Sequence, residues 1–216
     1  MPISESLKIN EIFYSVQGES TRIGLPTVFI RTTGCPMRCV YCDTAYAFHD
    51  GKNYTFEQIF YEIKQYGTKY LTVTGGEPLA QKPCFNFLQQ LCDLSYEVSL
   101  ETGGAVSIKN IDTRVKIILD IKTPGSGEVE NNDWNNLSLI KSNDEIKIVI
   151  TDEKDYKWAK EIILNENLMK KRTILLSPVH GEVDPELLAS WILRDRLPVR
   201  LQLQLHKIIW GNKKGV

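Results

Sequence analysis

Short runs of apolar, mostly β-branched residues recur along the chain and predict buried strands. They lie at residues 27–31, 70–74, 98–101, 115–120, 146–150, 173–177 and 200–205. Between several of these runs the apolar positions recur at helical spacing or follow a helix-start signal. These segments predict helices at residues 55–67, 83–94, 152–165 and 184–194. Strands that alternate with helices favour parallel pairing, so we expect an α/β fold.

Two of the predicted helices begin with specific capping signals. Thr55 followed by Gln58 has the spacing of a capping box, in which each side chain binds the other residue's backbone amide. Asp184 followed by Pro185 has the pattern of an N-cap and a first helical residue. Pro83 is a candidate first residue for the helix near Cys84.

The expected architecture is an incomplete, open parallel β/α barrel that forms a single domain over residues 1–216. A complete eightfold barrel needs about 250 residues, and this chain has 216. The connection over residues 102–114 is also too short for a helix. A doubly wound open sheet is the alternative.

Composition narrows the classes of function. With 26 basic and 27 acidic residues and a formal net charge of -1, the chain lacks the basic excess of a nucleic-acid-binding protein. No apolar run reaches the ~18 residues of a membrane helix, and residues 1–8 show no secretory signal. We therefore expect a cytoplasmic protein with neither a nucleic acid nor a membrane as partner.

The five cysteines are unevenly distributed. Cys35, Cys39 and Cys42 fall within eight residues, whereas Cys84 and Cys92 lie on a predicted helix, where they are expected to be small buried side chains. Three thiolates on one loop can hold a soft metal centre, such as an iron–sulfur cluster. A structural zinc site in a non-catalytic interaction module is the alternative, and its fourth ligand would be His49, Cys84 or Cys92.

Polar segments follow most of the predicted strands. They are residues 35–44, 75–78, 101–104, 120–122, 177–180 and 206–207. The carboxyl ends of parallel strands meet at one edge of a sheet or barrel, where such folds place their chemistry. The segments therefore predict one shared site.

Two motifs resemble those of radical S-adenosylmethionine (SAM) enzymes. The first is Cys35-x3-Cys39-x2-Cys42, and the second is Gly75-Gly76-Glu77-Pro78 directly after a predicted strand. More of the chain is similar to the 7-carboxy-7-deazaguanine synthase (QueE) family: residues 9–20, 24–31, 42–44, 101–104, 120–127 and 204–210. This resemblance implies a substrate segment at residues 9–24 and a cluster loop at residues 34–44. Ser20 stands where that family usually has glycine.

The resemblance implies a partial barrel with a [4Fe-4S] cluster, SAM and Mg²⁺ as cofactors. It implies a lyase that converts 6-carboxy-5,6,7,8-tetrahydropterin to 7-carboxy-7-deazaguanine with loss of ammonia, in 7-deazapurine (queuosine) biosynthesis. The radical comes from SAM, so no residue is singled out as catalytic. An electron donor such as flavodoxin or ferredoxin and a homodimer are further implied. A related radical enzyme that installs a glycyl radical on a partner protein is the nearest alternative.

The resemblance also implies roles for individual residues. The cluster ligands are Cys35, Cys39 and Cys42, and Thr44 offers a hydroxyl to Mg²⁺. The substrate contacts are Val16, Gln17, Gly18, Arg31 and Thr74, with Arg31 on the substrate carboxylate. The SAM contacts are Tyr41, Cys42, Asp43, Gly76, Glu77, Asp120, Lys122, Ser177 and His180. Glu77 is expected near the SAM ammonium group.

Several of these residues have simpler interpretations. Arg31 could form an ordinary ion pair, and Asp120 could pair with Lys122. Thr44 could stabilise only its own turn. Loss of ammonia needs proton transfer, and Glu19, His180 and His206 are unranked candidates for it.

Overall fold

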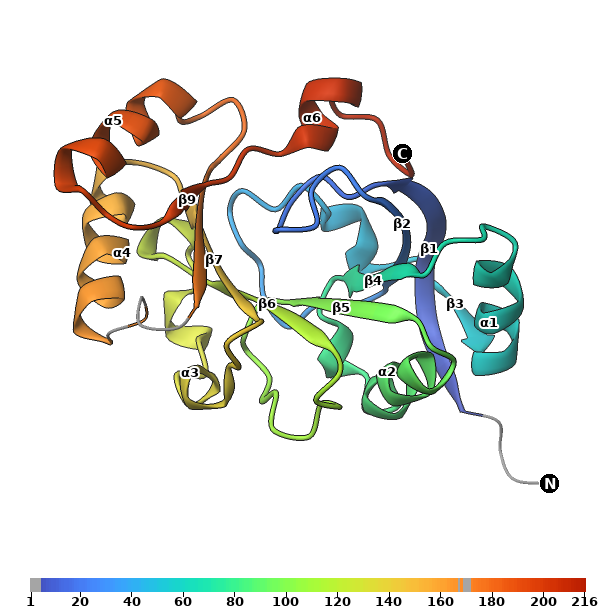
Figure 1. Cartoon of the computed structure of the whole chain (residues 1–216). Helices are drawn as coiled ribbons and strands as arrows, with labels where there is room; N and C mark the ends of the chain where they lie inside the picture. Colours follow the sequence, from blue (N-terminus) through green and yellow to red (C-terminus); the bar gives the residue numbers. More distant parts are fainter. Residues whose placement is uncertain (1–4, 167, 169–171) are drawn as a thin grey trace.

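A single mixed sheet is the framework of the chain (Figure 1). The computed structural model describes residues 5–166, 168 and 172–216, and in these residues the sheet has nine strands. They are β1 (Ser6–Val16), β2 (Pro26–Thr32), β3 (Lys52–Thr55), β4 (Tyr70–Gly75), β5 (Glu97–Thr102), β6 (Lys116–Ile121), β7 (Glu145–Ile150), β8 (Thr173–Pro178) and β9 (Arg200–Leu201). Strand β1 is antiparallel to β2 and β3, and every other pairing is parallel.

The sheet curves without closing. Its order is β3-β1-β2-β4-β5-β6-β7-β8-β9, so β3 and β9 are free edges. From β2 to β9 the strands follow chain order with no reversal, which confirms the partial barrel and excludes the doubly wound alternative. A backbone hydrogen bond links the two sides of the opening, because the Leu205 N–H donates to the Gly18 carbonyl at 2.9 Å.

Helices lie outside the curved sheet, with α1 and α2 at one end and α4 and α5 at the other (Figure 1). The helices are α1 (Phe56–Lys64), α2 (Cys84–Asp93), α3 (Asn136–Leu139), α4 (Glu153–Asn165), α5 (Pro185–Asp195) and α6 (Leu205–Trp210). Short 3-10 helices occur at η1 (Ala45–Phe48), η2 (Pro78–Ala80), η3 (Pro124–Ser126) and η4 (Val129–Asn131). Both capping signals are confirmed: Thr55 and Gln58 form a capping box, and the Asp184 side chain accepts the Glu186 N–H. Pro83 is the N-cap of α2, and the helix begins one residue later.

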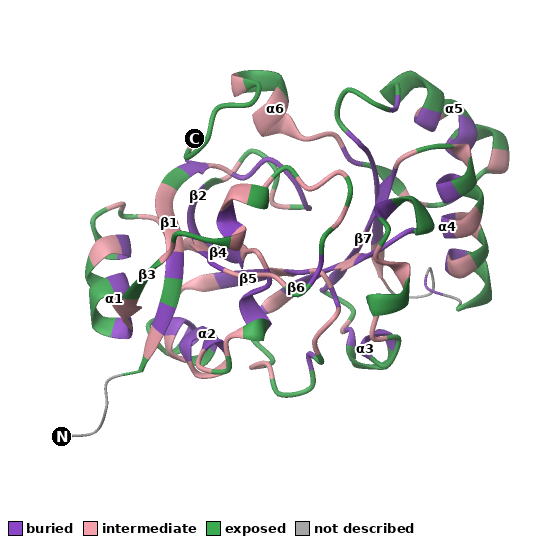
Figure 2. Ribbon diagram, turned by 180° about the vertical axis from the view of Figure 1, so that it is seen from behind, coloured by how far each residue is buried: buried purple, intermediate pink, exposed green. Residues whose placement is uncertain are grey.

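The hydrophobic core lies between the sheet and the helices. Along each parallel strand alternate residues face outward, as Leu71 and Val73 do on β4, and these pack with helix residues such as Phe87. Burying one such side chain contributes about 1.5–3 kcal/mol. Figure 2 shows this burial along the strands and the helix faces. The strand residues that alternate with these outward-facing ones point to the barrel interior, where polar groups are frequent.

Two predictions at the ends of the sheet were wrong or incomplete. The predicted strand at 200–205 ends at Leu201, and helix α6 begins at Leu205. The alternating leucines there do not form a ladder, because the chain turns away after the Gln202 N–H donates to the Leu176 carbonyl. Strands β1 and β3 were not predicted. The segment 9–24, expected to bind substrate, begins inside β1.

In the described part of the chain, no helix is long and apolar enough to cross a membrane. The expectation about a secretory signal depends partly on residues 1–4, which lie outside the described residues.

Candidate active site

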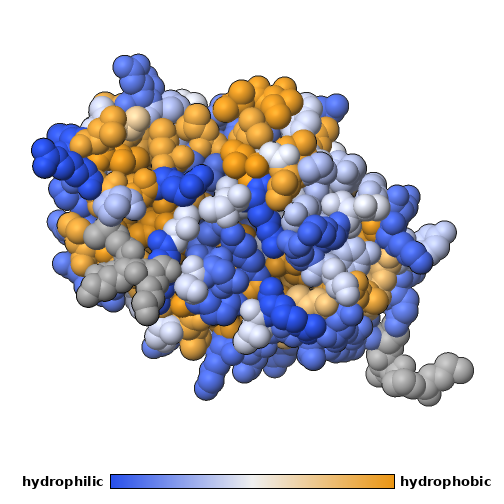
Figure 3. Space-filling view, viewed as in Figure 1, coloured by the Kyte–Doolittle hydropathy of each residue, from blue (hydrophilic) through white to orange (hydrophobic). Residues whose placement is uncertain are grey.

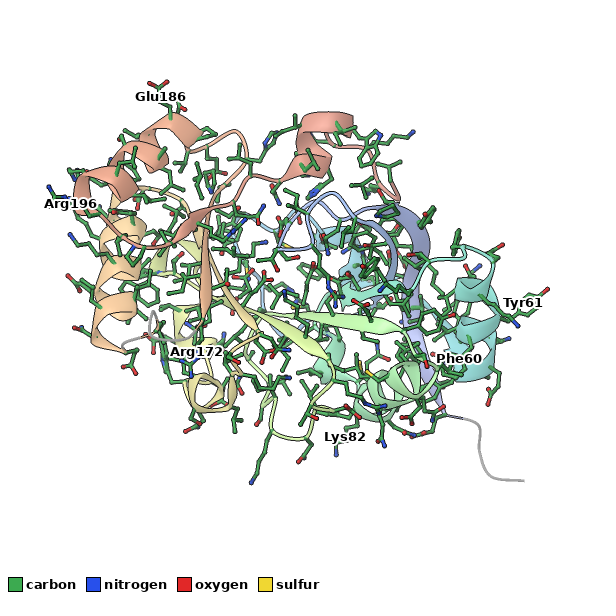
Figure 4. All side chains as sticks on the ribbon, in the orientation of Figure 1. Phe60, Tyr61, Lys82, Arg172, Glu186 and Arg196 are labelled. Atoms are coloured by element: carbon green, nitrogen blue, oxygen red, sulfur yellow. The ribbon has the colours of Figure 1, made fainter. Side chains whose placement is uncertain are left out.

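A cavity of about 400 Å³ occupies the barrel interior and reaches the carboxyl ends of the parallel strands. The side chains that fill this interior come from strands on opposite sides (Figure 4), whereas the labelled Tyr61 on α1 points away and is 85% exposed. Every predicted site residue except Glu77 lines the cavity: Val16, Gln17, Gly18, Arg31, Cys35, Cys39, Tyr41, Cys42, Asp43, Thr44, Thr74, Gly76, Asp120, Lys122, Ser177 and His180. The expected shared site is therefore present.

The cysteine loop begins where β2 ends and packs closely on the loop after β4. The Glu77 N–H donates to the Gly34 carbonyl at 2.8 Å, and a Cβ on Gly76 would lie 2.0 Å from that oxygen. Only glycine permits this approach of two backbones. The pairing brings the cysteine loop and the Gly75-Gly76 backbone to the same end of the cavity.

All three loop cysteines are free and partly exposed to the cavity. Burial raises the pKa of the Cys35, Cys39 and Cys42 thiols. A metal would reverse this effect, since coordination stabilises the thiolate.

A polar network crosses the barrel interior from the loop after β1. The Gln17 amide donates to the Thr72 hydroxyl at 3.1 Å and to Glu101 Oε1 at 3.4 Å, and the Thr74 hydroxyl donates to Glu101 Oε2 at 2.8 Å. Burial and the nearby Glu19 carboxylate raise the pKa of Glu101. This favours the neutral acid, which can donate a hydrogen bond.

Lys147 on β7 forms an ion pair with Glu19 inside the same interior. The Gln204 amide donates to the other Glu19 oxygen at 2.8 Å. Burial would raise the pKa of Glu19, but Lys147 and Gln204 outweigh it and hold the pKa below its ordinary value. The Glu19 carboxylate is therefore charged in this structure and is held in place by Lys147 and Gln204.

Sequence reasoning placed Glu101 only within a polar segment, without a role of its own, and it did not select Lys147. The sequence pattern could have identified both, because each is a charged residue within an apolar strand, as in Ile146-Lys147-Ile148. Since side chains alternate across a strand, a charge there must face the barrel interior or disrupt the core.

Arg31 forms an ion pair and also lines the cavity, so its geometry is compatible with both interpretations made from sequence. Its Nε donates to Glu11 Oε1 at 2.7 Å, and its guanidinium lies over the Phe13 and Tyr46 rings. The side chain also lines the cavity. Within the described residues its terminal Nη atoms have no hydrogen-bond partner, so the ion pair leaves them available to a ligand.

Asp120 and Lys122 pair with each other, with Nζ 3.0 Å from Oδ2. Burial would lower the pKa of Lys122, but Asp120 and neighbouring groups raise it above its ordinary value, so the ammonium is charged. The other Asp120 oxygen and the Tyr41 hydroxyl are buried and have no partner among the described residues. Such polar atoms at a cavity wall indicate a ligand that supplies the missing hydrogen bonds.

Comparisons with known proteins decide the family. Residues 29–189 match the model of the radical SAM superfamily. A 7-carboxy-7-deazaguanine synthase of Chlorobaculum tepidum is 46% identical, with both chains covered completely. Another from Koribacter versatilis is 38% identical, covering 97% of this chain and all of the relative. This chain belongs to the 7-carboxy-7-deazaguanine synthase family of radical SAM enzymes.

The fold of this family member also matches solved structures. The crystal structure of QueE from Escherichia coli superposes with a TM-score of 0.77 at 22% identity, covering 93% of this chain and 95% of that one. Because the chain belongs to this family, it is neither the zinc-binding interaction module nor the glycyl-radical-installing enzyme that the sequence left as alternatives. The cofactors of a radical SAM enzyme are a [4Fe-4S] cluster and SAM.

The donors in the cavity fit these cofactors. Three thiols line one end, and no group of three His, Cys, Asp or Glu side chains in the described ranges is arranged to hold a single metal ion. A cluster does not require such convergence, because each thiolate binds a different iron. The unpartnered Asp120 oxygen and Tyr41 hydroxyl are suited to the polar groups of SAM.

The structure separates Glu77 from the other predicted SAM contacts. Its carboxylate is fully buried outside the cavity lining, where it accepts the Thr102 hydroxyl at 2.9 Å and the Leu79 and Gly103 amides at 3.0 and 2.8 Å. Burial raises the pKa of this carboxyl. Backbone donors and a hydroxyl occupy both of its oxygens in this structure, and the contact between Glu77 and the SAM ammonium group stays a prediction.

The remaining candidates, Thr44, His206 and His180, also line the cavity. The Thr44 hydroxyl donates to Asp43 Oδ1 at 2.9 Å. No donor among the described residues binds its oxygen, so the lone pairs are available for a cation. His206 abuts Gly18, and burial lowers its pKa. His180 lines the cavity and is exposed.

Proposed function

We propose that the cavity converts 6-carboxy-5,6,7,8-tetrahydropterin to 7-carboxy-7-deazaguanine with release of ammonia. One observation supports this most: a single cavity combines the three cysteines, unpartnered polar atoms for SAM and an interior wall of hydrogen-bonding side chains. When bound, the cluster and SAM supply a radical that removes hydrogen from the substrate.

The cysteine end of the cavity serves the cofactors in this proposal. Cys35, Cys39 and Cys42 ligate the cluster. The backbone at Gly76 lies against this loop, where it can accept the SAM amino group in place of the buried Glu77 carboxylate. The other SAM contacts are Tyr41, Asp43, Asp120, Lys122, Ser177 and His180.

The barrel interior serves the substrate. The free Nη atoms of Arg31 bind its carboxylate as a planar fork. Gln17 and Thr74 present hydrogen-bonding groups to the pterin edge, together with Val16 and Gly18. The Gln17 amide oxygen accepts the Glu19 N–H at 3.2 Å, so the network fixes the orientation of that amide before substrate arrives.

Thr44 is the proposed Mg²⁺ contact. A hydroxyl is a hard oxygen ligand, and Mg²⁺ commonly retains waters and binds through few protein groups. The Asp43 carboxylate beside it holds the hydroxyl in place.

The proposal includes a protein of one domain that forms a homodimer in the cytoplasm and does not bind nucleic acid. Flavodoxin or ferredoxin would reduce its cluster. Exposed apolar side chains on α5 and α6 support an association surface: Leu187, Leu193, Ile208 and Ile209. The hydrophobic colour in Figure 3 gathers over these helices. Light scattering measures the molar mass of the purified protein, which should be twice that of the single chain.

An anaerobic assay tests the reaction. The reconstituted protein, supplied with substrate, SAM and a reductant, should form the deazaguanine product, and Cys39→Ala should form none and lack the cluster's electron paramagnetic resonance signal. Cys92→Ala, which removes a buried cysteine on α2, is the matched control and should retain both. A reconstituted wild-type protein that cleaves SAM but yields no deazaguanine would contradict the proposal.

A further inference from the structure

The middle cysteine of the loop is flanked by two backbone amides that donate hydrogen bonds to a distant segment. The Arg38 N–H donates to Glu128 Oε1 at 2.7 Å, and the Val40 N–H donates to the Ser126 carbonyl at 3.0 Å. These amides stand directly before and after Cys39 in the chain. Among the described residues, they are the bonds that join the amides of residues 36–41 to another part of the chain.

The Glu128 carboxylate is itself held in place. Asn131 donates its amide to the second carboxylate oxygen, Oε2. The Glu128 N–H donates to the Ser126 hydroxyl at 3.0 Å, and that hydroxyl donates to the Thr123 carbonyl at 2.6 Å. Each Glu128 oxygen thus has one donor, and the acceptor for Arg38 has a fixed direction.

The segment is fixed further by a buried carboxylate on α4. Asp155 accepts the Gly125 N–H at 2.9 Å and the Thr123 hydroxyl at 2.8 Å, and it is 2% exposed. A Cβ on Gly125 would lie 2.4 Å from Asp155 Oδ2. A continuous path of hydrogen bonds therefore runs from the outer helix to the cysteine loop.

The other contacts of the loop near its middle are made by side chains, because Met37 is buried and the Arg38 guanidinium lies over the Phe48 ring. Val40 is 81% exposed. The Arg38 guanidinium donates to the Cys35 and Met37 carbonyls, both at 2.7 Å, so these bonds stay within the loop. An exposed loop without external hydrogen bonds samples many conformations.

We propose that Glu128 is a positioning residue that orients Cys39 toward the cluster by accepting the Arg38 amide hydrogen. The proposal depends on the proposed ligation by Cys39, and it concerns a residue that does not line the cavity. A carboxylate acceptor makes a stronger hydrogen bond than a neutral one, which suits a contact in an exposed loop.

Three variants separate this role from general stability. Glu128→Ala removes the acceptor, Glu128→Gln keeps an acceptor oxygen without the charge, and Glu130→Ala changes an exposed glutamate two positions away. In the apoprotein, hydrogen exchange of the peptide covering residues 37–42 should be about tenfold faster in Glu128→Ala. In the reconstituted protein, the same variant should lose iron to a chelator several-fold faster. Its electron paramagnetic resonance signal should also be broader than that of the wild type.

Glu128→Gln should restore most of the protection, and Glu130→Ala should match wild type. Unchanged exchange and iron loss in Glu128→Ala would overturn the proposal, as would a Gln variant as defective as the Ala variant. Loss of protection throughout Glu128→Ala would also overturn it, because Glu128 would then support the whole fold. A wild-type protein that binds no cluster would instead refute the proposed function, and the apoprotein exchange would still test the contact.

Discussion

The ion pair between Lys147 and Glu19 should contribute strongly to folding. Both side chains are largely buried in the barrel interior, with 14% and 12% exposed. Lys147→Met removes the cation and keeps a side chain of similar length. The Glu19 carboxylate would then remain buried, with the Gln204 amide as its closest remaining donor.

The expected loss is about 2–4 kcal/mol of unfolding free energy near neutral pH. Removing one partner of a fully buried pair costs about 3–5 kcal/mol. The cavity gives both groups some access to water, which lowers the expected loss to the bottom of that range or slightly below it. The double variant Glu19→Gln with Lys147→Met should lose less than the sum of the single losses, because no unpaired charge remains.

The loss should depend on pH. In the wild type the pKa of Glu19 lies below 4.5 and that of Lys147 above 10.5. The pair therefore contributes fully between these values; it weakens as pH falls through the folded pKa of Glu19 or rises through that of Lys147. Without Lys147, burial dominates and the pKa of Glu19 rises above its ordinary value. The destabilisation of Lys147→Met should then shrink as pH falls from 8 toward 5, since the protonated acid needs no cation.

Urea unfolding of the reduced apoprotein at pH 5.5 and pH 8 measures both effects. Lys157→Met on α4 is the control, because its pair with Glu153 is exposed (61% and 43%) and should contribute less than about 1 kcal/mol. A loss below about 1 kcal/mol in Lys147→Met at pH 8, or an equal loss at both pH values, would refute the reasoning, since a buried unpaired carboxylate must cost more than an exposed one.

Three further substitutions test the site. Thr44→Ala should weaken Mg²⁺ stimulation of turnover but leave SAM cleavage largely intact; unchanged metal dependence would remove Thr44 from the site. Arg31→Ala should raise KM about tenfold or more, because a charge-assisted contact of about 1.5–3 kcal/mol is lost, and steady-state kinetics should show a smaller rise for Glu11→Gln, which leaves the guanidinium in place. Gly76→Ala should reduce iron content after reconstitution, since the new Cβ would lie 2.0 Å from the Gly34 carbonyl oxygen; normal iron content would disprove the importance of this approach.

The parallel strands were predictable because their apolar runs are local in sequence. Strands β2, β4 and β7 fall within two residues of the predicted bounds. Each is covered by helices on one face, and each parallel pairing joins neighbours in the predicted alternation. A central strand of this kind therefore shows its identity in its own residues.

The ends of the sheet depend on tertiary contacts, and there the prediction failed. Strand β1 has a mixed burial pattern, since only one of its faces meets the core. The leucines at 201, 203 and 205 alternate like a strand, but β9 lies at an edge and has a partner on one side only. After Gln202 bonds to β8, the chain crosses the barrel opening, where the Leu205 N–H donates to the Gly18 carbonyl.

Glu77 shows why the location of the site was predictable while the direction of one side chain was not. Its position after β4 follows from strand order, because parallel strands in chain order bring their carboxyl ends to one edge. The direction of its carboxylate depends on the turn after β5, where Thr102 and Gly103 supply three of its hydrogen bonds. That turn lies 25 residues further along the chain, and no spacing within Gly-Gly-Glu-Pro reports it. A buried carboxylate must take whichever donors are nearest, since leaving it unpaired costs several kcal/mol. The same requirement explains why the Asp120 oxygen, which has no such donor in the described residues, is the better candidate to meet a ligand.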